Sequence, residues 1–161
     1  MINHDDLHDV YAATGAAVWH LQFLEDVLVT YVTMRLRLRP KTSEAVAYSI
    51  LARERRRTLG ALLKDAKAAE LLVGPTADAF HLLLDERNWL VHRVVNEFAD
   101  NLYQTDARLA LLARLRTLTD RAIELKKWLY DETASWCRSQ GVDLARVDQI
   151  AVARVQKLRG A

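Results

Sequence analysis

Residues 76–98 read TADAFHLLLDERNWLVHRVVNEF, and the spacing of their apolar side chains indicates the fold class. Successive residues of an α-helix advance by about 100°, which places one set of these side chains along a single stripe. The set comprises Phe80, Leu83, Leu84, Val91, Val94 and Phe98. The stretch is therefore predicted to be a helix whose apolar stripe faces a core.

The residues outside this stretch predict further helices. Gly74, Pro75 and Thr76 supply a helix-ending glycine, a break and an N-cap, and Pro40 ends an earlier helix. The expected helices cover about residues 5–38, 43–72, 76–100 and 105–139, and a last helix follows Asp143. We therefore expect an all-α protein that forms a single up-and-down bundle of about five helices, in one domain over residues 1–161.

A second apolar repeat lies in the expected helix over residues 105–139. Its members alternate at spacings of four and three, as in a coiled coil. They are Leu111, Leu115, Leu118, Ala122, Leu125 and Leu129. Such a seam packs either against helices of the same chain or against a second subunit.

Composition narrows the class of protein. The chain has 161 residues, 51% of them hydrophobic and 27% charged, with five glycines, two prolines and a formal net charge of +2. No uninterrupted apolar run reaches the length of about 18 residues that a membrane span needs, and the acidic start does not resemble a secretory signal. We expect a cytoplasmic protein without a membrane anchor, in which the single Cys137 packs between helices.

Arg87 stands near the middle of the apolar stripe of residues 76–98. A buried guanidinium without a partner costs several kcal/mol, so Arg87 requires an anionic partner, a subunit boundary or a wet cleft. Glu25, Asp26 and Glu86 are the candidate partners. Beside the stripe, the spacing of Asn88 and His92 would let the amide hydrogen-bond the imidazole.

The order of these residues resembles the signature of the HEPN superfamily, in which a polar residue often follows an arginine and a histidine stands five positions after that arginine. Here the matching residues are Arg87, Asn88 and His92. The resemblance implies a helical bundle and a metal-independent ribonuclease in which Arg87 and His92 are catalytic. It also implies a homodimer whose two motifs line one composite cleft.

The same resemblance suggests a role as a toxin or phage-defence effector, with an antitoxin or inhibitor protein as a partner. HEPN toxins that are neutralised by a nucleotidyltransferase commonly carry a tyrosine two positions after the histidine. Val94 occupies that position here, which argues against this route of neutralisation.

The residue types suit RNA cleavage without a metal or another cofactor. Histidine gives and takes protons near neutral pH, and arginine can hold a phosphodiester and stabilise the charge that develops on it. RNA supplies its own nucleophile, the 2′-hydroxyl. The expected products are a 2′,3′-cyclic phosphate and a 5′-hydroxyl.

A basic run provides candidate RNA contacts. Arg53, Arg55, Arg56 and Arg57 surround Glu54 within about one turn and a half of helix. These arginines either contact RNA phosphates, if the turn lies beside His92, or form a solvated turn. Two alternatives to a nuclease therefore stay open: a non-catalytic nucleotide- or RNA-binding module, and a helical adaptor or dimerisation protein.

Overall fold

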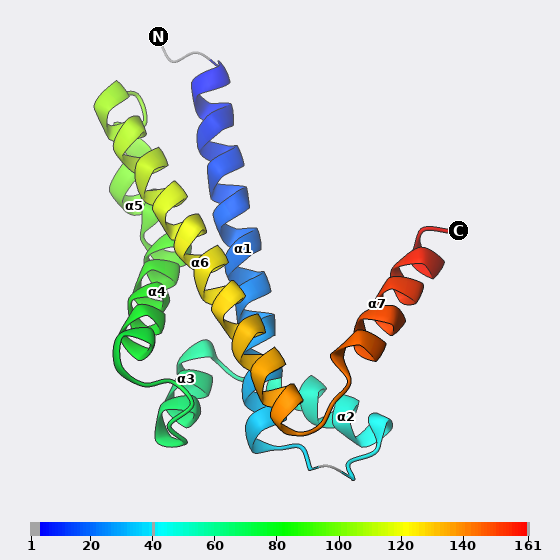
Figure 1. Ribbon diagram of the computed structural model, residues 1–161. Helices are drawn as coiled ribbons and strands as arrows, with labels where there is room; N and C mark the ends of the chain where they lie inside the picture. Colours follow the sequence, from blue (N-terminus) through cyan, green and yellow to red (C-terminus); the bar gives the residue numbers. More distant parts are fainter. Residues whose placement is uncertain (1–3, 40, 161) are drawn as a thin grey trace. The chain divides into compact units, whose positions relative to one another are not determined.

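The computed structural model describes residues 4–39 and 41–160, and all regular secondary structure in these ranges is helical (Figure 1). This confirms the all-α class. The chain divides into two compact units, Met1–Lys127 and Trp128–Ala161. No helix in the described ranges is both long enough and apolar enough to cross a bilayer.

The described residues form seven α-helices and one short 3-10 helix rather than about five helices. The first unit holds α1 (His4–Leu36), α2 (Glu44–Glu54), α3 (Leu59–Ala68), α4 (Gly74–His92), α5 (Val94–Phe98), η1 (Ala99–Asn101) and the beginning of α6 (Thr105–Ser139). The second unit holds the end of α6 and α7 (Leu144–Leu158).

The helix expected over residues 43–72 is divided into α2 and α3. Thr58 caps the second piece, because its hydroxyl oxygen accepts a hydrogen bond from the amide of Ala61 at 3.3 Å. Arg57, just before this cap, donates hydrogen bonds to carboxylates on both sides of the break. The break therefore gives the Arg57 side chain access to α2 and to α3 at once.

The helix expected over residues 76–100 is also interrupted. α4 starts at Gly74, whose φ of 55° lies in the left-handed region that glycine adopts easily, and ends at His92. After Arg93 the chain continues as α5 and η1. A hydrogen bond of 2.7 Å from the Trp89 indole nitrogen to the Glu97 carboxylate spans this interruption. His92 is therefore the last residue of its helix.

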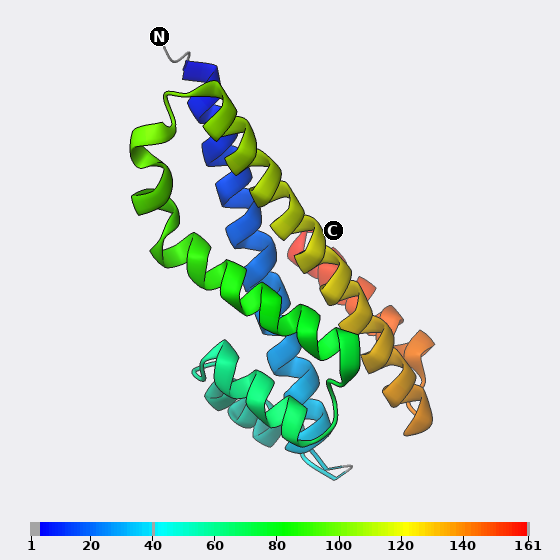
Figure 2. The same ribbon diagram turned by 90° about the vertical axis from the view of Figure 1, so that its left-hand side faces the viewer.

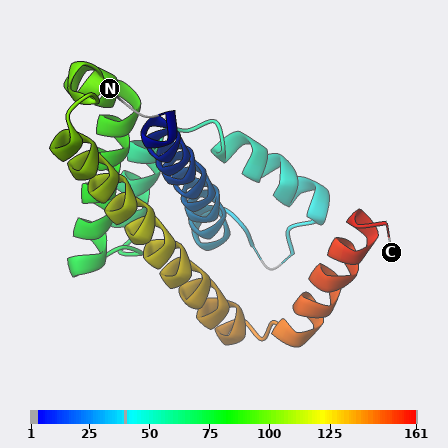
Figure 3. The ribbon, with the colours of Figure 1, turned by 90° about the horizontal axis from the view of Figure 1, so that it is seen from above.

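The core of the first unit lies between α1, α4 and the first half of α6. Figure 2 shows the backbones of these three helices, and ion pairs join α4 to both of the others. Each helix contributes a row of buried apolar side chains: Leu21, Leu24, Leu28 and Tyr31 from α1, Phe80, Leu83 and Leu90 from α4, and Leu111, Leu115, Leu118 and Ala122 from α6. In the view from above, α2 and the first half of α6 lie on different sides of α1 (Figure 3).

The predicted stripe on α4 is correct in its first half and wrong at Val91, whose side chain is 53% exposed. Leu90 and Trp89 are buried instead. Trp89 lies outside the expected stripe and is covered by the guanidinium of Arg114, whose Cζ is 3.4 Å from the ring centroid. A polar residue of α6 therefore buries an aromatic ring that periodicity assigns to the surface.

Local features of the second unit follow the sequence closely. Asp143 caps α7 by accepting a hydrogen bond from the amide of Arg146, and Gly141 before it has a φ of 75°. Cys137 is buried, as expected, and burial raises the pKa of its thiol. A thiol in this state is a packing group rather than a nucleophile.

Candidate functional site

Arg87 projects from α4 toward α1 and is 33% exposed. Its Nε donates a hydrogen bond to Glu25 Oε1 at 3.1 Å, and its Nη1 donates to Asn88 Oδ1 at 3.4 Å. Of the three anionic partners considered from the sequence, Glu25 is the one that pairs with it. Nη2 makes no hydrogen bond to any residue that the structure describes, so one corner of a fixed guanidinium stays available.

His92 lies on the surface at the end of α4. Within the described ranges its ring has no hydrogen-bond partner, and the expected bond from Asn88 is not formed. The amide oxygen of Asn88 accepts from Arg87 instead. Asn88 therefore helps to orient the arginine and not the histidine.

A second cluster fixes the end of α4 to α6. Arg114 makes a two-pronged ion pair with Glu86, with Nε–Oε2 and Nη2–Oε1 distances of 2.9 and 3.0 Å. The same guanidinium covers the Trp89 ring, whose indole nitrogen holds Glu97. These contacts surround the residues just before His92, so the backbone that carries the histidine is held on two sides.

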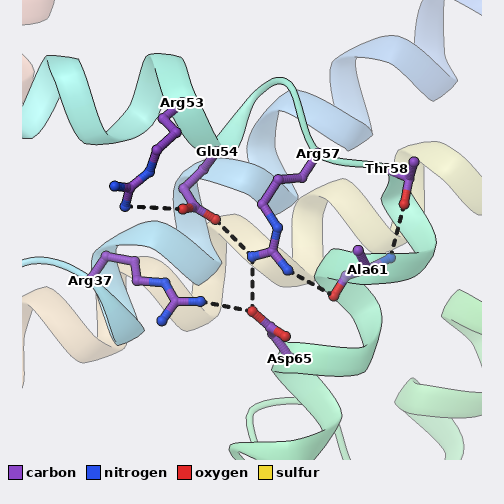
Figure 4. A network of polar contacts seen from close by, with 7 residues as sticks. All are labelled: Arg37, Arg53, Glu54, Arg57, Thr58, Ala61 and Asp65. Carbon is purple, nitrogen blue, oxygen red and sulfur yellow. Dashed lines mark hydrogen bonds and ion pairs between the residues drawn. The ribbon is translucent and has the colours of Figure 1, made fainter.

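The basic run lies at the break between α2 and α3, and two of its four arginines, Arg53 and Arg57, pair with carboxylates there (Figure 4). Arg57 Nη1 is 2.8 Å from Glu54 Oε2 and 2.8 Å from Asp65 Oδ2. Asp65 also accepts from Arg37 at 2.8 Å, and Glu54 from Arg53 at 3.4 Å. Glu54 is only 4% exposed, so it is a buried carboxylate enclosed by arginines.

The other two arginines of the run differ from each other. Arg55 makes a two-pronged pair with Asp26 of α1, at 2.7 and 3.1 Å. Arg56 is exposed and has no ion-pair partner within the described part of the chain. A role for all four arginines in binding RNA stays a prediction, and Arg56 is the member of the run whose charge is not offset by a neighbouring carboxylate.

A hollow of about 260 Å³ lies between the basic run and α1. Arg55 and Arg57 line it together with Glu25 and Asp26, which are neighbours on α1. Since Glu25 holds Arg87, the basic run approaches the motif from the side of Arg87. A shared phosphate site would require the basic run to lie beside His92. No hydrogen bond or ion pair within the described ranges joins the run to His92.

The carboxylates of the network shown in Figure 4 give the stability of the protein a pH dependence. Hydrogen bonding to Arg57 lowers the pKa of both Glu54 and Asp65 below their ordinary values. A carboxyl group with a lowered folded-state pKa stabilises the fold above its unfolded pKa, and this stabilisation is lost as the pH falls through the folded value. The loss is therefore expected below about pH 4.

We expect urea midpoints to change little from about pH 7 to about pH 5 and to fall steeply toward about pH 3. In Glu54→Gln the fall should be smaller, because one of the two titrating groups is gone. An equally steep fall in the variant would show that Glu54 does not contribute to this acid sensitivity.

Sequence reasoning missed two groups of interacting residues. Arg114 carried no signal in the sequence, because its partner Glu86 is 28 positions away. Asp65 carried none because Arg37 is also 28 positions away and Arg57 lies across a break that periodicity did not predict. Glu54 did carry a signal, since a single acid within a run of arginines is a natural hub for ion pairs. In the described ranges no three histidine, cysteine, aspartate or glutamate side chains lie close enough together to hold a metal ion.

The arrangement contains one fixed arginine, one free histidine at a helix end and a basic turn that is largely neutralised. Comparisons of this chain with known protein families, with curated proteins and with solved structures found no significant match.

Proposed function

We propose that this protein is a metal-independent endoribonuclease of the HEPN type, in which Arg87 holds the scissile phosphate and His92 transfers the proton. The observation that carries the proposal is the contrast between these two side chains. Arg87 is fixed by Glu25 and Asn88 with Nη2 left over, while the His92 ring has no partner in the described ranges. Arg87 therefore suits the role of a phosphate clamp, and His92 is the residue type that most often transfers protons in acid–base catalysis.

In the proposed reaction His92 removes the proton of the 2′-hydroxyl, and the 2′ oxygen attacks the adjacent phosphorus. The bond from phosphorus to the 5′ oxygen breaks, and that oxygen takes up a proton. The products are a 2′,3′-cyclic phosphate and a 5′-hydroxyl. Arg87 stabilises the charge on the non-bridging oxygens as it builds up.

Five residues of helix separate the two side chains by about 7.5 Å along the axis and about 140° around it. The phosphate would therefore lie over the end of α4, with Arg87 reaching toward it from the α1 side. One histidine cannot serve easily as base and acid together. The resemblance to the HEPN superfamily implies a homodimer with a composite site, in which the other copy supplies the second histidine. Such a cleft would suit an intracellular toxin or phage-defence effector that has its own inhibitor protein.

One observation favours a second candidate, a non-catalytic RNA- or nucleotide-binding module or a helical adaptor. Glu25 offsets the charge of Arg87, and acidic neighbours offset most of the basic run. An arginine with this environment also suits a purely structural role. Cleavage and binding assays together separate the nuclease, the binding module and the adaptor.

The test is to incubate the purified protein with a mixed RNA pool in excess chelator and to identify the chemistry of the new ends. The proposal expects cyclic phosphate and 5′-hydroxyl ends that accumulate with time. RNA that stays intact at high protein concentration contradicts the nuclease. Filter binding of the same pool then decides between the RNA-binding module and the adaptor.

A further inference from the structure

One face of the first unit exposes aromatic side chains of α1. Trp19 and Phe23 are 62% and 46% exposed. The Trp19 and Phe23 rings lie against each other, with centroids 5.8 Å apart. Large aromatic side chains that remain in water on one helix are typical of a surface that another molecule covers.

A hollow of about 480 Å³ lies between α1 and the first half of α6, and its nearest residue on α1, Ala16, is one turn before Trp19. Its floor is made of small side chains, Ala12, Ala13 and Ala16, and Leu112 closes it from α6. Charged residues surround it: Asp9, Arg116 and Asp120. The face thus carries a large projecting side chain and, one turn away, a recess with a mostly apolar floor.

We infer that this face binds a second copy of the same chain, with Trp19 of each copy filling the hollow of the other. The inference follows from the positions along α1. Trp19 stands three residues after Ala16, and Ala13 stands three residues before it. A two-fold axis at Ala16 with the two α1 helices antiparallel therefore sets each Trp19 at the level of the other copy's Ala13.

The same two-fold axis also brings together oppositely charged residues of the two copies. Asp9 stands seven residues before Ala16, and Phe23 stands seven residues after it, two helical turns in each direction. Lys126 Nζ is 5.4 Å from the centroid of the Phe23 ring. The axis therefore sets Asp9 of one copy beside Lys126 of the other. Neither residue has an ion-pair partner among the described residues of its own chain.

This contact is separate from the proposed nuclease site. Glu25, which holds Arg87, is about 160° around α1 from Phe23, so the two surfaces are on opposite sides of the helix. The composite cleft at the end of α4 would require a different two-fold contact. Trp19 takes no part in the proposed nuclease site, so Trp19→Ser tests the α1 contact alone. Weakened self-association with cleavage retained supports the α1 contact, and unchanged self-association overturns it whatever the RNA assay shows.

The experiment measures mass in solution by sedimentation across micromolar concentrations. The wild type should self-associate, and Trp19→Ser should raise the Kd of the association through α1 by about thirtyfold or more, as expected for a central tryptophan. Tyr48→Ser is the matched control, since Tyr48 is an exposed aromatic residue on α2. Circular dichroism confirms that the variants stay helical.

A charge swap tests the geometry itself. Asp9→Lys should weaken association, and Lys126→Glu in the same chain should restore it, because the pair is then reversed. A monomeric wild type, a dimer insensitive to Trp19→Ser, or no restoration by the swap overturns the inference. If the wild type is monomeric or Trp19→Ser has no effect, this face of α1 either binds a different partner or remains exposed to solvent.

Discussion

Replacing His92 by alanine is expected to lower the rate of RNA cleavage by about 10²–10⁴-fold, the usual contribution of a general acid or base. The structure makes this replacement unusually easy to interpret. The ring is exposed and makes no hydrogen bond within the described ranges, so its removal leaves no buried group unpaired. The measurement is the initial rate on a defined RNA in chelator.

His81→Ala is the control for this prediction, because His81 is an exposed histidine on the same helix. It should cleave at the wild-type rate. If His92→Ala cleaves as fast as His81→Ala, the proton transfer does not involve His92 and the proposed mechanism is wrong. Equal unfolding midpoints for both variants would show that any loss of rate is chemical.

Replacing Arg57 by methionine is expected to destabilise the fold by about 3 kcal/mol. The change leaves the Glu54 carboxylate, at 4% exposure, without its closest partner at 2.8 Å. It also removes one of the two arginines that bind Asp65. Urea unfolding at neutral pH measures the loss, and the expected result is a lower midpoint with an unchanged slope.

Arg56→Met is the matched control, since it removes the same charge from the adjacent exposed residue, and it should change stability by less than about 0.5 kcal/mol. A third variant isolates the cause. Arg57→Met combined with Glu54→Met should be more stable than Arg57→Met alone, because the buried carboxylate that has lost its closest partner is gone. If the double variant is the less stable of the two, desolvation of Glu54 is not the source of the loss.

Periodicity predicted the helical class and much of the core. The Leu111, Leu115, Leu118 and Ala122 repeat is buried as expected, because a seam with this spacing has one apolar side. Periodicity did not predict the break at residues 55–58. At this break the side chain of Arg57 donates a hydrogen bond to Asp65. A pattern of hydrophobicity does not predict such a polar contact.

In the candidate site, too, some features could be predicted from the sequence and others could not. The position of Arg87 within an apolar stripe required an anionic partner, a subunit boundary or a wet cleft, and the structure provides an anionic partner, Glu25. The direction of Asn88 was not predictable, since an amide at this position reaches either Arg87 or His92. Arg114 was missed because its ion pair with Glu86 joins two helices that are distant in sequence.

The ion pairs around Arg57 also limit which amino-acid substitutions this sequence can accept during evolution. Positive and negative groups alternate through Arg53, Glu54, Arg57, Asp65 and Arg37, so each inner member neutralises two others. Losing Arg57 alone leaves the buried Glu54 with only the more distant Arg53, whereas losing Arg57 and Glu54 together leaves no buried acid. Substitutions at these two positions should therefore be inherited in pairs, while Arg56 beside them drifts freely.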